Sequence, residues 1–544
     1  MIRLDRSVGG RRLSIEVNHR KTFLGGAVLL SIAALITKII SAGYRIPYQN
    51  MTGDLGFYVY QQMYPFYGFM AIVSLYGFPV VLSRRLASAN QRDARTDAAA
   101  YFVGLMMFSI LAALFMIGAA PWLAISMGDP QLTGVLRITG FSFLFLPFLS
   151  VTRGISQGQG DMVPTAVSNV GEQLVRVSAI LIITYLLMKS GADAYQFGTG
   201  AIYGSLLGSF TSVVILCLFL FKRGGSFGLT ELKKLPILSG IRQSGHLLAQ
   251  SVFICMNALV LIFFQFADVF TMIHLLEGFG MSEGQAYQVK GVFDRGQPFI
   301  QLGTILATTM ALALVPAIAQ AQANKNHTSA LAYQDMALRL ALLLGGAATI
   351  GLIIIMNPVN HMLFTDEQGS SVLRILVLSI APCSIYLTTA AILQGYGKVR
   401  WPAFIILIGV VVKLIANVIL IPVMGAMGSS LATTIAFVLM ATLGLCFIKR
   451  AAGNIYTHFK PYGAIAGTFA ALIIVATLSL WLLDGWIGMG QTRALDTVIA
   501  LTVSVIGGLA VLICLFTLPI FTASEWEQVP KLNRLKRVFS SRKG

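Results

Sequence analysis

Charged residues are scarce in this sequence of 544 residues. They make up 11% of the chain, and 56% of the residues are hydrophobic, whereas a typical soluble protein is about 25% charged. This balance excludes an ordinary soluble fold, because the apolar surface would exceed what a water-exposed domain can bury. The apolar residues gather in long runs, and a helical membrane span needs about 20 of them. The sequence therefore predicts an all-α, polytopic membrane protein of about 14 transmembrane helices.

Sequence signatures of metal, redox or hydrolytic chemistry are also missing. The five cysteines lie in apolar runs without CxxC spacing, and the six histidines have no ligand spacing, so no metal site or disulfide framework is predicted. The chain has no GxxxxGK[ST], HExxH or GxSxG motif, which are the signatures of nucleotide, zinc-protease and serine-hydrolase sites. We therefore predict a protein that is not an enzyme and has no cofactor.

Fourteen apolar runs are bounded by charge, glycine or proline. Six lie in the first part of the chain, at 24–47, 58–82, 98–124, 131–151, 162–188 and 196–221. Six follow at 245–276, 287–317, 333–356, 371–393, 402–424 and 427–448, and two close the chain at 459–484 and 495–521. The run at 24–47 is too long for the apolar core of a signal peptide, so it is predicted to be the first permanent span.

Lys and Arg are distributed unequally between alternate loops. One set of loops and tails holds 28 of these residues and the opposite set holds three, counting Arg153 in the first set and Lys290 in the second. Cytoplasmic loops carry the excess of Lys and Arg, so both termini are predicted to be cytoplasmic and Asp54 and Asp366 to lie in outer loops. The net charge of +18 then belongs to the inner surface beside anionic lipids, and no nucleic-acid partner is needed to explain it.

The two halves of the chain repeat one another. QGQG at 157–160 with Pro164 has a counterpart in QGYG at 394–397 with Pro402. Parallel repeats of six spans are typical of transporters. The predicted organisation is a basic segment (1–23), a first lobe (24–221), a basic linker (222–244), a second lobe (245–448), two further spans (449–521) and a basic tail (522–544).

Eight basic residues remain inside the predicted spans, where a charge costs about 2.5 to 3.5 kcal/mol at the bilayer centre. They are Lys38, Arg45, Arg137, Arg176, Arg295, Arg339, Arg374 and Lys413. Arg137, Arg339 and Arg374 lie near span ends, from which a long side chain can reach the interface. The others lie deeper and indicate water, a partner or a ligand.

Three acidic residues accompany these cations. Glu172 and Arg176 have the i, i+4 spacing of a helical ion pair, and Asp268 and Asp294 lie in spans of the second lobe. A packing pair and a polar cavity are both compatible with Glu172 and Arg176. Cations outnumber acids in this set, which favours a cavity with an anionic ligand.

Three stretches resemble a known family. They are YRIPY…TGDLGFYVYQQMYPFYGF…GFPVVLSRRLA (44–87), RGISQGQGDMVPTAVSNVGEQLVR (153–176) and LQGYGKVRWPA…VKLIANVILIPVMGAMGSSLAT (393–433). They are similar to the polysaccharide-exporter branch of the multidrug/oligosaccharidyl-lipid/polysaccharide (MOP) superfamily, and within it to the stage V sporulation protein B and MurJ-like lipid II flippases.

The resemblance implies two six-helix lobes in pseudo-twofold, MATE-like repeat around a cavity, with two added helices. It also implies export of an undecaprenyl-pyrophosphate-linked saccharide across a bacterial cell membrane. Membrane lipids are then partners of the protein, and whether the cell-wall synthesis machinery is a further partner stays open. Arg45, Arg295 and, at the end of its span, Arg84 match the cavity cations of such flippases. Lys38, Arg176 and Lys413 are the further candidates for binding the substrate.

Several alternatives stay open at this stage. The substrate is lipid II or another polyprenyl-linked unit, and the drive is membrane potential or coupling to Na⁺ or H⁺ through Glu172, Asp268 or Asp294. A cation-coupled drug exporter would have a cavity richer in acids than in bases. A membrane glycosyltransferase would need paired carboxylates or a large aqueous loop, whereas the longest loop, 222–244, is short and basic.

Overall fold

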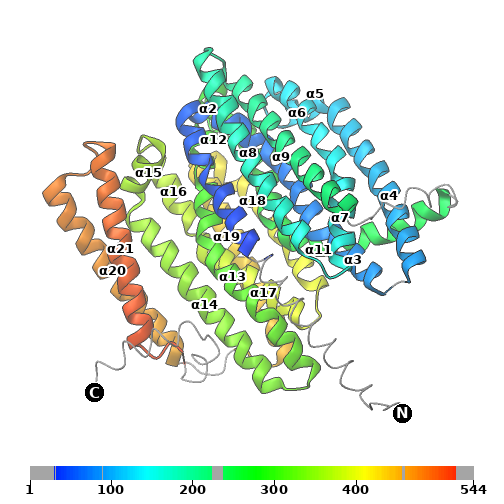
Figure 1. Ribbon diagram of the computed structural model, residues 1–544. Coiled ribbons are helices and arrows are strands. Elements are labelled where there is room, and N and C mark those ends of the chain that lie inside the picture. Colours follow the sequence, from blue (N-terminus) through cyan, green and yellow to red (C-terminus); the bar gives the residue numbers. More distant parts are fainter. Residues whose placement is uncertain (1–29, 31, 89, 223–236, 456–459, 522–544) are drawn as a thin grey trace, which may run out of the picture. The chain divides into compact units, whose positions relative to one another are not determined.

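The computed structural model describes residues 30, 32–88, 90–222, 237–455 and 460–521. The described residues are almost entirely helical and contain no β-strand (Figure 1). The predicted segments 1–23 and 522–544, most of the linker 222–244 and the beginning of the first span lie outside the described residues.

Helical segments of the described residues that are long and apolar enough to cross a membrane number twelve. They correspond to thirteen of the predicted spans, because Ile32–Ser88 covers both the first and the second. The remaining prediction, 287–317, falls on helices α12 and α13. Some boundaries agree because charge interrupts the apolar run there: α8 ends at Lys189 and α18 begins at Arg400.

The chain forms two compact units. Among the described residues, unit 1 contains 30, 32–44, 63–88, 90–125, 130–222 and 237–259, and unit 2 contains 45–62, 126–129, 260–455 and 460–521. Unit 1 holds α3 (Phe78–Ser88), α4 (Gln91–Gly118), α5 (Ala120–Ser126, with its last residue in unit 2), α6 (Thr133–Gly140), α7 (Leu146–Gly158), α8 (Val163–Lys189) and α9 (Ala194–Lys222).

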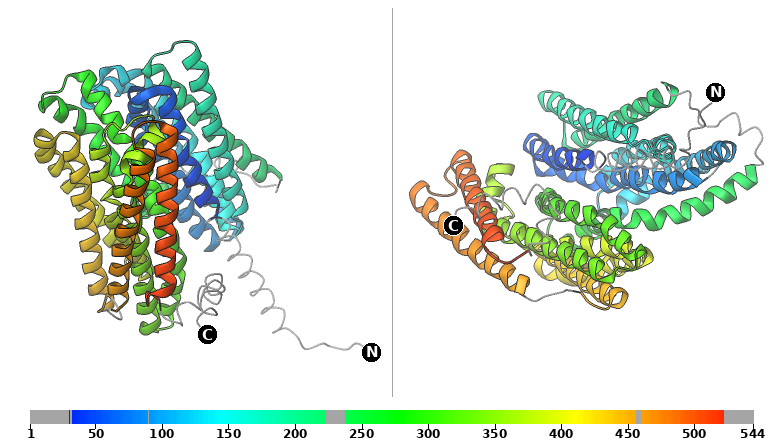
Figure 2. Two further views of the ribbon diagram at one scale, coloured as in Figure 1. Left: turned by 90° about the vertical axis from the view of Figure 1, so that its left-hand side faces the viewer. Right: turned by 60° about the horizontal axis from the view of Figure 1, so that its bottom comes forward.

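Unit 2 holds α12 (Glu283–Asp294), α13 (Gly296–Ala323), α14 (His327–Ile354), α15 (Met356–Phe364), α16 (Ser370–Val377), α17 (Ile380–Gly395), α18 (Arg400–Met424), α19 (Ala426–Ala452), α20 (Lys460–Ile487) and α21 (Arg493–Thr517). Helices α2 (Arg45–Ile72) and α11 (Ile237–Gly278) contribute residues to both units. Helices α20 and α21 pack against each other and run side by side in Figures 1 and 2.

The two QGxG motifs build the same turn. Helices α7 and α17 each end in a turn with a left-handed glycine, Gly160 (φ 79°) and Gly397 (φ 73°). The following backbone N–H bonds back to Ser156 O in one turn and Leu393 O in the other, at 3.0 and 2.8 Å. This is the Schellman ending, in which glycine avoids the Cβ clash of the left-handed conformation. The sequence repeat is therefore also a repeat of local structure.

Apolar side chains cover the outside of the helices. On α18, Phe404, Val411, Ile415 and Val423 are between 53% and 73% exposed. These residues follow one another at helical spacing along one face. An exposed apolar stripe of this length is the surface expected to contact lipid acyl chains.

Candidate functional site

A fully buried guanidinium occupies the junction of α12 and α13. Arg295 Nε and Nη2 donate to the two carboxylate oxygens of Asp54 at 2.8 and 2.6 Å. Its Nη1 and Nη2 donate to the two oxygens of Asp366 at 2.6 and 3.1 Å, and Nη1 also reaches Asn360 Oδ1 at 3.5 Å. We call Asp54, Arg295 and Asp366 the clasp. Both forked edges of the guanidinium bind an anion, the geometry in which Arg binds carboxylate or phosphate most strongly.

Local sequence explains how the clasp assembles. Asp54 directly follows Gly53, whose φ of 67° interrupts α2. The backbone of Asp54 packs against Gly291 of α12, where a Cβ atom would lie 2.2 Å from the Asp54 carbonyl oxygen. Asp366 lies in the turn between α15 and α16. Burial alone would raise the pKa of Asp366, but the hydrogen bonds and charge of Arg295 hold it below its ordinary value, so this carboxyl is ionised at neutral pH.

A second cluster in unit 2 surrounds Lys413. Its ammonium lies 2.7 Å from Asp268 Oδ1 and donates to Thr433 Oγ1 at 2.7 Å and to the Ser429 carbonyl and hydroxyl oxygens at 3.0 Å. Asn417, one turn further along α18, donates to the same Asp268 oxygen at 3.1 Å. The Lys413 ammonium is thus a buried charge that is both paired and hydrogen-bonded, as the burial of a charge requires.

Lys290 and Asp294 form a neighbouring buried ion pair at 2.6 Å with i, i+4 spacing. Helix α12 begins after Ser282, whose backbone N–H is accepted by Gln285 Oε1 at 3.1 Å. The i, i+4 spacing of Lys290 and Asp294 places both charges on one face of this helix. The Phe293 ring lies 5.5 Å from the Lys290 ammonium and 5.9 Å from that of Lys413.

Unit 1 contains a cluster around Glu172 on α8. Arg153 Nη2 lies 3.0 Å from Glu172 Oε2, and both side chains are less than 5% exposed. Arg153 also donates to Ser212 Oγ at 2.9 Å and to Ser74 at 3.2 Å. Tyr67 donates to the other Glu172 oxygen at 3.3 Å. The carboxylate is therefore compensated by a cation and a hydroxyl within one unit.

Arg176 lies beside this cluster. Its guanidinium donates to Ser41 Oγ at 2.9 Å and lies 5.4 Å from the ring centres of Tyr44 and Tyr67. Gly208 of α9 packs against it, since a Cβ there would lie 2.6 Å from the Arg176 Cβ. The predicted ion pair between Glu172 and Arg176 stays a prediction; what the structure adds is that both contact the ring or hydroxyl of Tyr67.

The two halves place their polar contacts alike. Arg176 on α8 reaches Ser41 in the first predicted span, and Lys413 on α18 reaches Asp268 in the seventh. In each case a basic residue of the fifth span of its half contacts the first span of that half. The sequence repeat therefore extends to the contacts that these two basic side chains make.

The other predicted substrate-binding cations lie in different surroundings. Arg45 is the first residue of α2, is fully buried and acts electrostatically on Asp294. Lys38 is exposed on unit 1. Arg84 is exposed near the end of α3.

Three placements from the sequence are wrong. Arg153 and Lys290, counted as loop residues, lie inside α7 and α12, and each is at most 2% exposed. Arg339, expected to reach the interface, is 1% exposed and pairs with Asp335 at 3.2 Å. The i, i+4 spacing of Lys290 with Asp294 was a usable signal. Nothing in the sequence links Arg153 to Glu172, because the two residues lie on different helices.

Comparison with known proteins assigns the chain to a family. The model of the polysaccharide biosynthesis proteins matches residues 23–322, and the model of the lipid II flippase MurJ matches residues 298–519. The chain belongs to the polysaccharide biosynthesis protein family. It is 35% identical to the uncharacterized membrane protein YabM of Bacillus subtilis over 95% of this chain and 96% of that one. It is also 26% identical to the lipid II flippase MurJ of the same organism, over 90% and 94% of the two chains.

Solved structures confirm the fold predicted from the resemblance. The lipid II flippase MurJ in an inward closed conformation superposes with a TM-score of 0.66 at 16% identity, covering 90% of this chain and 98% of that one. A MATE-family multidrug transporter of the MOP superfamily superposes with a TM-score of 0.63 at 19% identity, covering 79% and 98%. The chain is a multi-pass membrane protein with a MurJ- and MATE-like fold, and one of its sequence relatives is named a lipid II flippase.

Proposed function

We propose that this protein carries a polyprenyl-pyrophosphate-linked saccharide, lipid II first among the candidates, from the inner to the outer leaflet of a bacterial cell membrane by alternating access. It does so without enzymatic chemistry, and both of its termini are cytoplasmic. Membership of the polysaccharide biosynthesis family and the named flippase relative support this assignment.

The observation that carries the proposal is the clasp. A pyrophosphate presents pairs of anionic oxygens, as two carboxylates do, and the guanidinium of Arg295 already binds two carboxylates through both forked edges. Asp54 and Asp366 then act as internal anions that the incoming pyrophosphate displaces. Because Asp54 belongs to α2 and Asp366 to the turn before α16, this exchange links substrate binding to movement of both segments.

The remaining cations complete the proposed binding set. Lys38, Arg45 and Arg176 supply positive charge for the pyrophosphate, with Arg84 at the end of α3 as a site of first electrostatic contact. Lys413 is held by Asp268 and three further oxygen contacts, so its proposed part is to hold charge in place within unit 2.

Membrane potential is the proposed drive. Glu172, Asp268 and Asp294 each have a basic side chain within 3.0 Å, so a Na⁺ ion at any of them would compete with a cation already tethered there. Moving one negative charge outward is favoured by about 2.3 kcal/mol per 100 mV of inside-negative potential.

A drug exporter of the same fold is less consistent with the charges. Residues at the candidate sites comprise seven bases (Lys38, Arg45, Arg153, Arg176, Lys290, Arg295 and Lys413) and five acids (Asp54, Glu172, Asp268, Asp294 and Asp366). An exporter of cationic drugs would need the opposite balance, because like charges would repel its substrate.

Transport of defined lipids by the purified protein tests the proposal. Proteoliposomes loaded with lipid II, with another polyprenyl-pyrophosphate saccharide or with a cationic dye are compared with and without an inside-negative potential. We expect lipid movement that rises with the potential and is indifferent to a Na⁺ gradient. Movement of the dye alone, or of no probe, would overturn the proposal.

Arg295→Lys and Arg45→Ala test the proposed binding groups, and Arg45→Ala should abolish transport while protein abundance stays near normal. Lysine keeps the positive charge of Arg295 but cannot make the bidentate hydrogen bonds of a guanidinium. Transport should therefore fall at least about tenfold while protein abundance stays near normal. Arg137→Lys, at an exposed arginine of α6, is the matched control and should transport normally. Equal transport by Arg295→Lys and the wild type would exclude bidentate binding at Arg295.

A further inference from the structure

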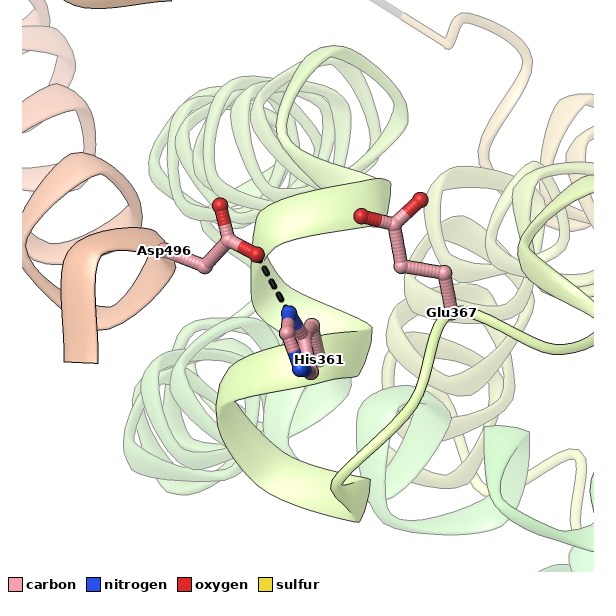
Figure 3. A group of neighbouring side chains, drawn as sticks. All are labelled: His361, Glu367 and Asp496. Carbon is pink, nitrogen blue, oxygen red and sulfur yellow. Dashed lines mark hydrogen bonds and ion pairs between the residues drawn. The ribbon is translucent and has the colours of Figure 1, made fainter. Parts of the chain in front are cut away.

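Three side chains with metal-ligating atoms converge near the clasp, on unit 2. His361 comes from α15, Glu367 from the turn between α15 and α16, and Asp496 from the first turn of α21. One ligand atom from each lies within 4.8 Å of the other two. Figure 3 shows the imidazole of His361 with the Asp496 carboxylate at its Nδ1 atom and the Glu367 carboxylate on the neighbouring segment.

The surroundings of Asp496 favour a fixed ligand. Its side chain is fully buried, and one carboxylate oxygen contacts the His361 ring. The other accepts the backbone N–H of Gly490 at 3.1 Å. Hydrogen bonds of this kind orient metal-binding carboxylates. Glu367 reaches solvent, so an ion has a route in.

Charge explains why a cation suits this place. Two carboxylates face one imidazole, and like charges this close repel each other unless a cation lies between them. A proton on His361 neutralises one of the two carboxylates, whereas a divalent ion neutralises both. Imidazole nitrogen combined with carboxylate oxygens suits zinc and similar transition ions better than Mg²⁺ or Ca²⁺, which prefer oxygen ligands alone.

We propose that His361, Glu367 and Asp496 bind a divalent transition-metal ion of the Zn²⁺ class, with water completing the coordination. The ion joins α21 to the turn that carries Asp366. The site could not be found from residue spacing, because Asp496 lies 135 residues from His361. The packing of α21 against α15 brings the two side chains together.

Zinc titration of the purified full-length protein tests this site. After chelator treatment, Zn²⁺ is titrated in competition with a fluorescent zinc indicator, and Mg²⁺ serves as the comparison ion. We expect one saturable Zn²⁺ site in the wild type that is more than about 100-fold weaker in His361→Ala, Glu367→Gln and Asp496→Asn, since loss of even an outer partner of a ligand costs about 10- to 100-fold. Zn²⁺ should also raise the melting temperature of the wild type and not of these variants, since an ion that binds only the folded state stabilises it.

Matched controls are His327→Ala and Glu283→Gln, at an exposed histidine and glutamate of α14 and α12. Both should bind Zn²⁺ as the wild type does. Glu367→Gln decides the result if the buried Asp496 variant fails to fold. Absence of saturable Zn²⁺ binding by the wild type, or unchanged binding by Glu367→Gln and His361→Ala, would overturn the site. Neither result depends on which lipid the protein carries.

Discussion

Replacement of Arg153 by methionine should destabilise the protein strongly. The change removes the cation 3.0 Å from Glu172 and leaves a carboxylate with 4% side-chain exposure, together with Ser74 and Ser212, without the guanidinium. Breaking a buried pair by removing one partner costs about 3 to 5 kcal/mol. Tyr67 still donates to Glu172, which keeps the expected loss toward the lower end of that range.

The same geometry gives unequal effects for the two partners. In Glu172→Gln, Arg153 keeps its contacts with Ser74 and Ser212 and gains an amide oxygen, so the loss should be near that of one charge-assisted hydrogen bond, about 1.5 to 3 kcal/mol. The double variant Arg153→Met with Glu172→Leu removes both charges and should recover most of the stability, because well-packed apolar replacements of buried pairs are often neutral.

Membrane abundance and detergent melting of the wild type, Arg153→Met, Glu172→Leu and the double variant measure the coupling, and Glu172→Gln is compared separately. Arg137→Met, at an exposed arginine, is the control and should change stability little. Wild-type melting of Arg153→Met would refute the reasoning, since Glu172 would then not depend on Arg153. Full transport by the double apolar variant would further show that the pair serves packing alone.

Other expected outcomes follow from single contacts. Lys413→Ala should lower the melting temperature, because it leaves Asp268 without its cation. The double variant Lys413→Met with Asp268→Leu should recover most of the lost stability. A Lys413→Ala protein that melts like the wild type would contradict this ion pair. Gly208→Ala should destabilise by about 1 to 3 kcal/mol through overpacking against α8, whereas Gly463→Ala, where a new Cβ meets nothing within 4 Å, should not. A cysteine introduced by Lys325→Cys should resist impermeant thiol reagents added to intact cells, and its labelling from outside would reverse the predicted topology.

Much of the fold could be predicted because each membrane span is formed by one contiguous stretch of the sequence. Apolar runs and the charges that end them act locally, and the QGxG turns depend on glycine at one position. The repeat was visible for the same reason. Lys290 was misplaced because a charged residue at the start of an apolar run looks like a loop residue, although its partner Asp294 was only one helical turn away.

The partners of the candidate residues were harder to predict. Arg295 was identified as a deep cation, but its carboxylates at Asp54 and Asp366 are 241 and 71 residues away and were expected in loops. Hydrophobic periodicity along the sequence does not indicate such contacts, because they arise from tertiary packing. The cluster of His361, Glu367 and Asp496 was missed for the same reason, since ligand spacing in sequence detects only sites built on one local segment.

The break at Gly53 has a mechanical consequence for the clasp. Regular helical hydrogen bonding is already interrupted at the residue before Asp54, and a glycine at φ 67° has no Cβ to resist rotation. We expect rotation about this one residue to swing the Asp54 carboxylate relative to Arg295 while the hydrogen bonds of the helical turns on either side stay intact. Gly53 is therefore the pivot that the proposed release of Asp54 from the clasp would use, and the main cost of that release would be the lost contacts of Asp54 with Arg295 and Gly291.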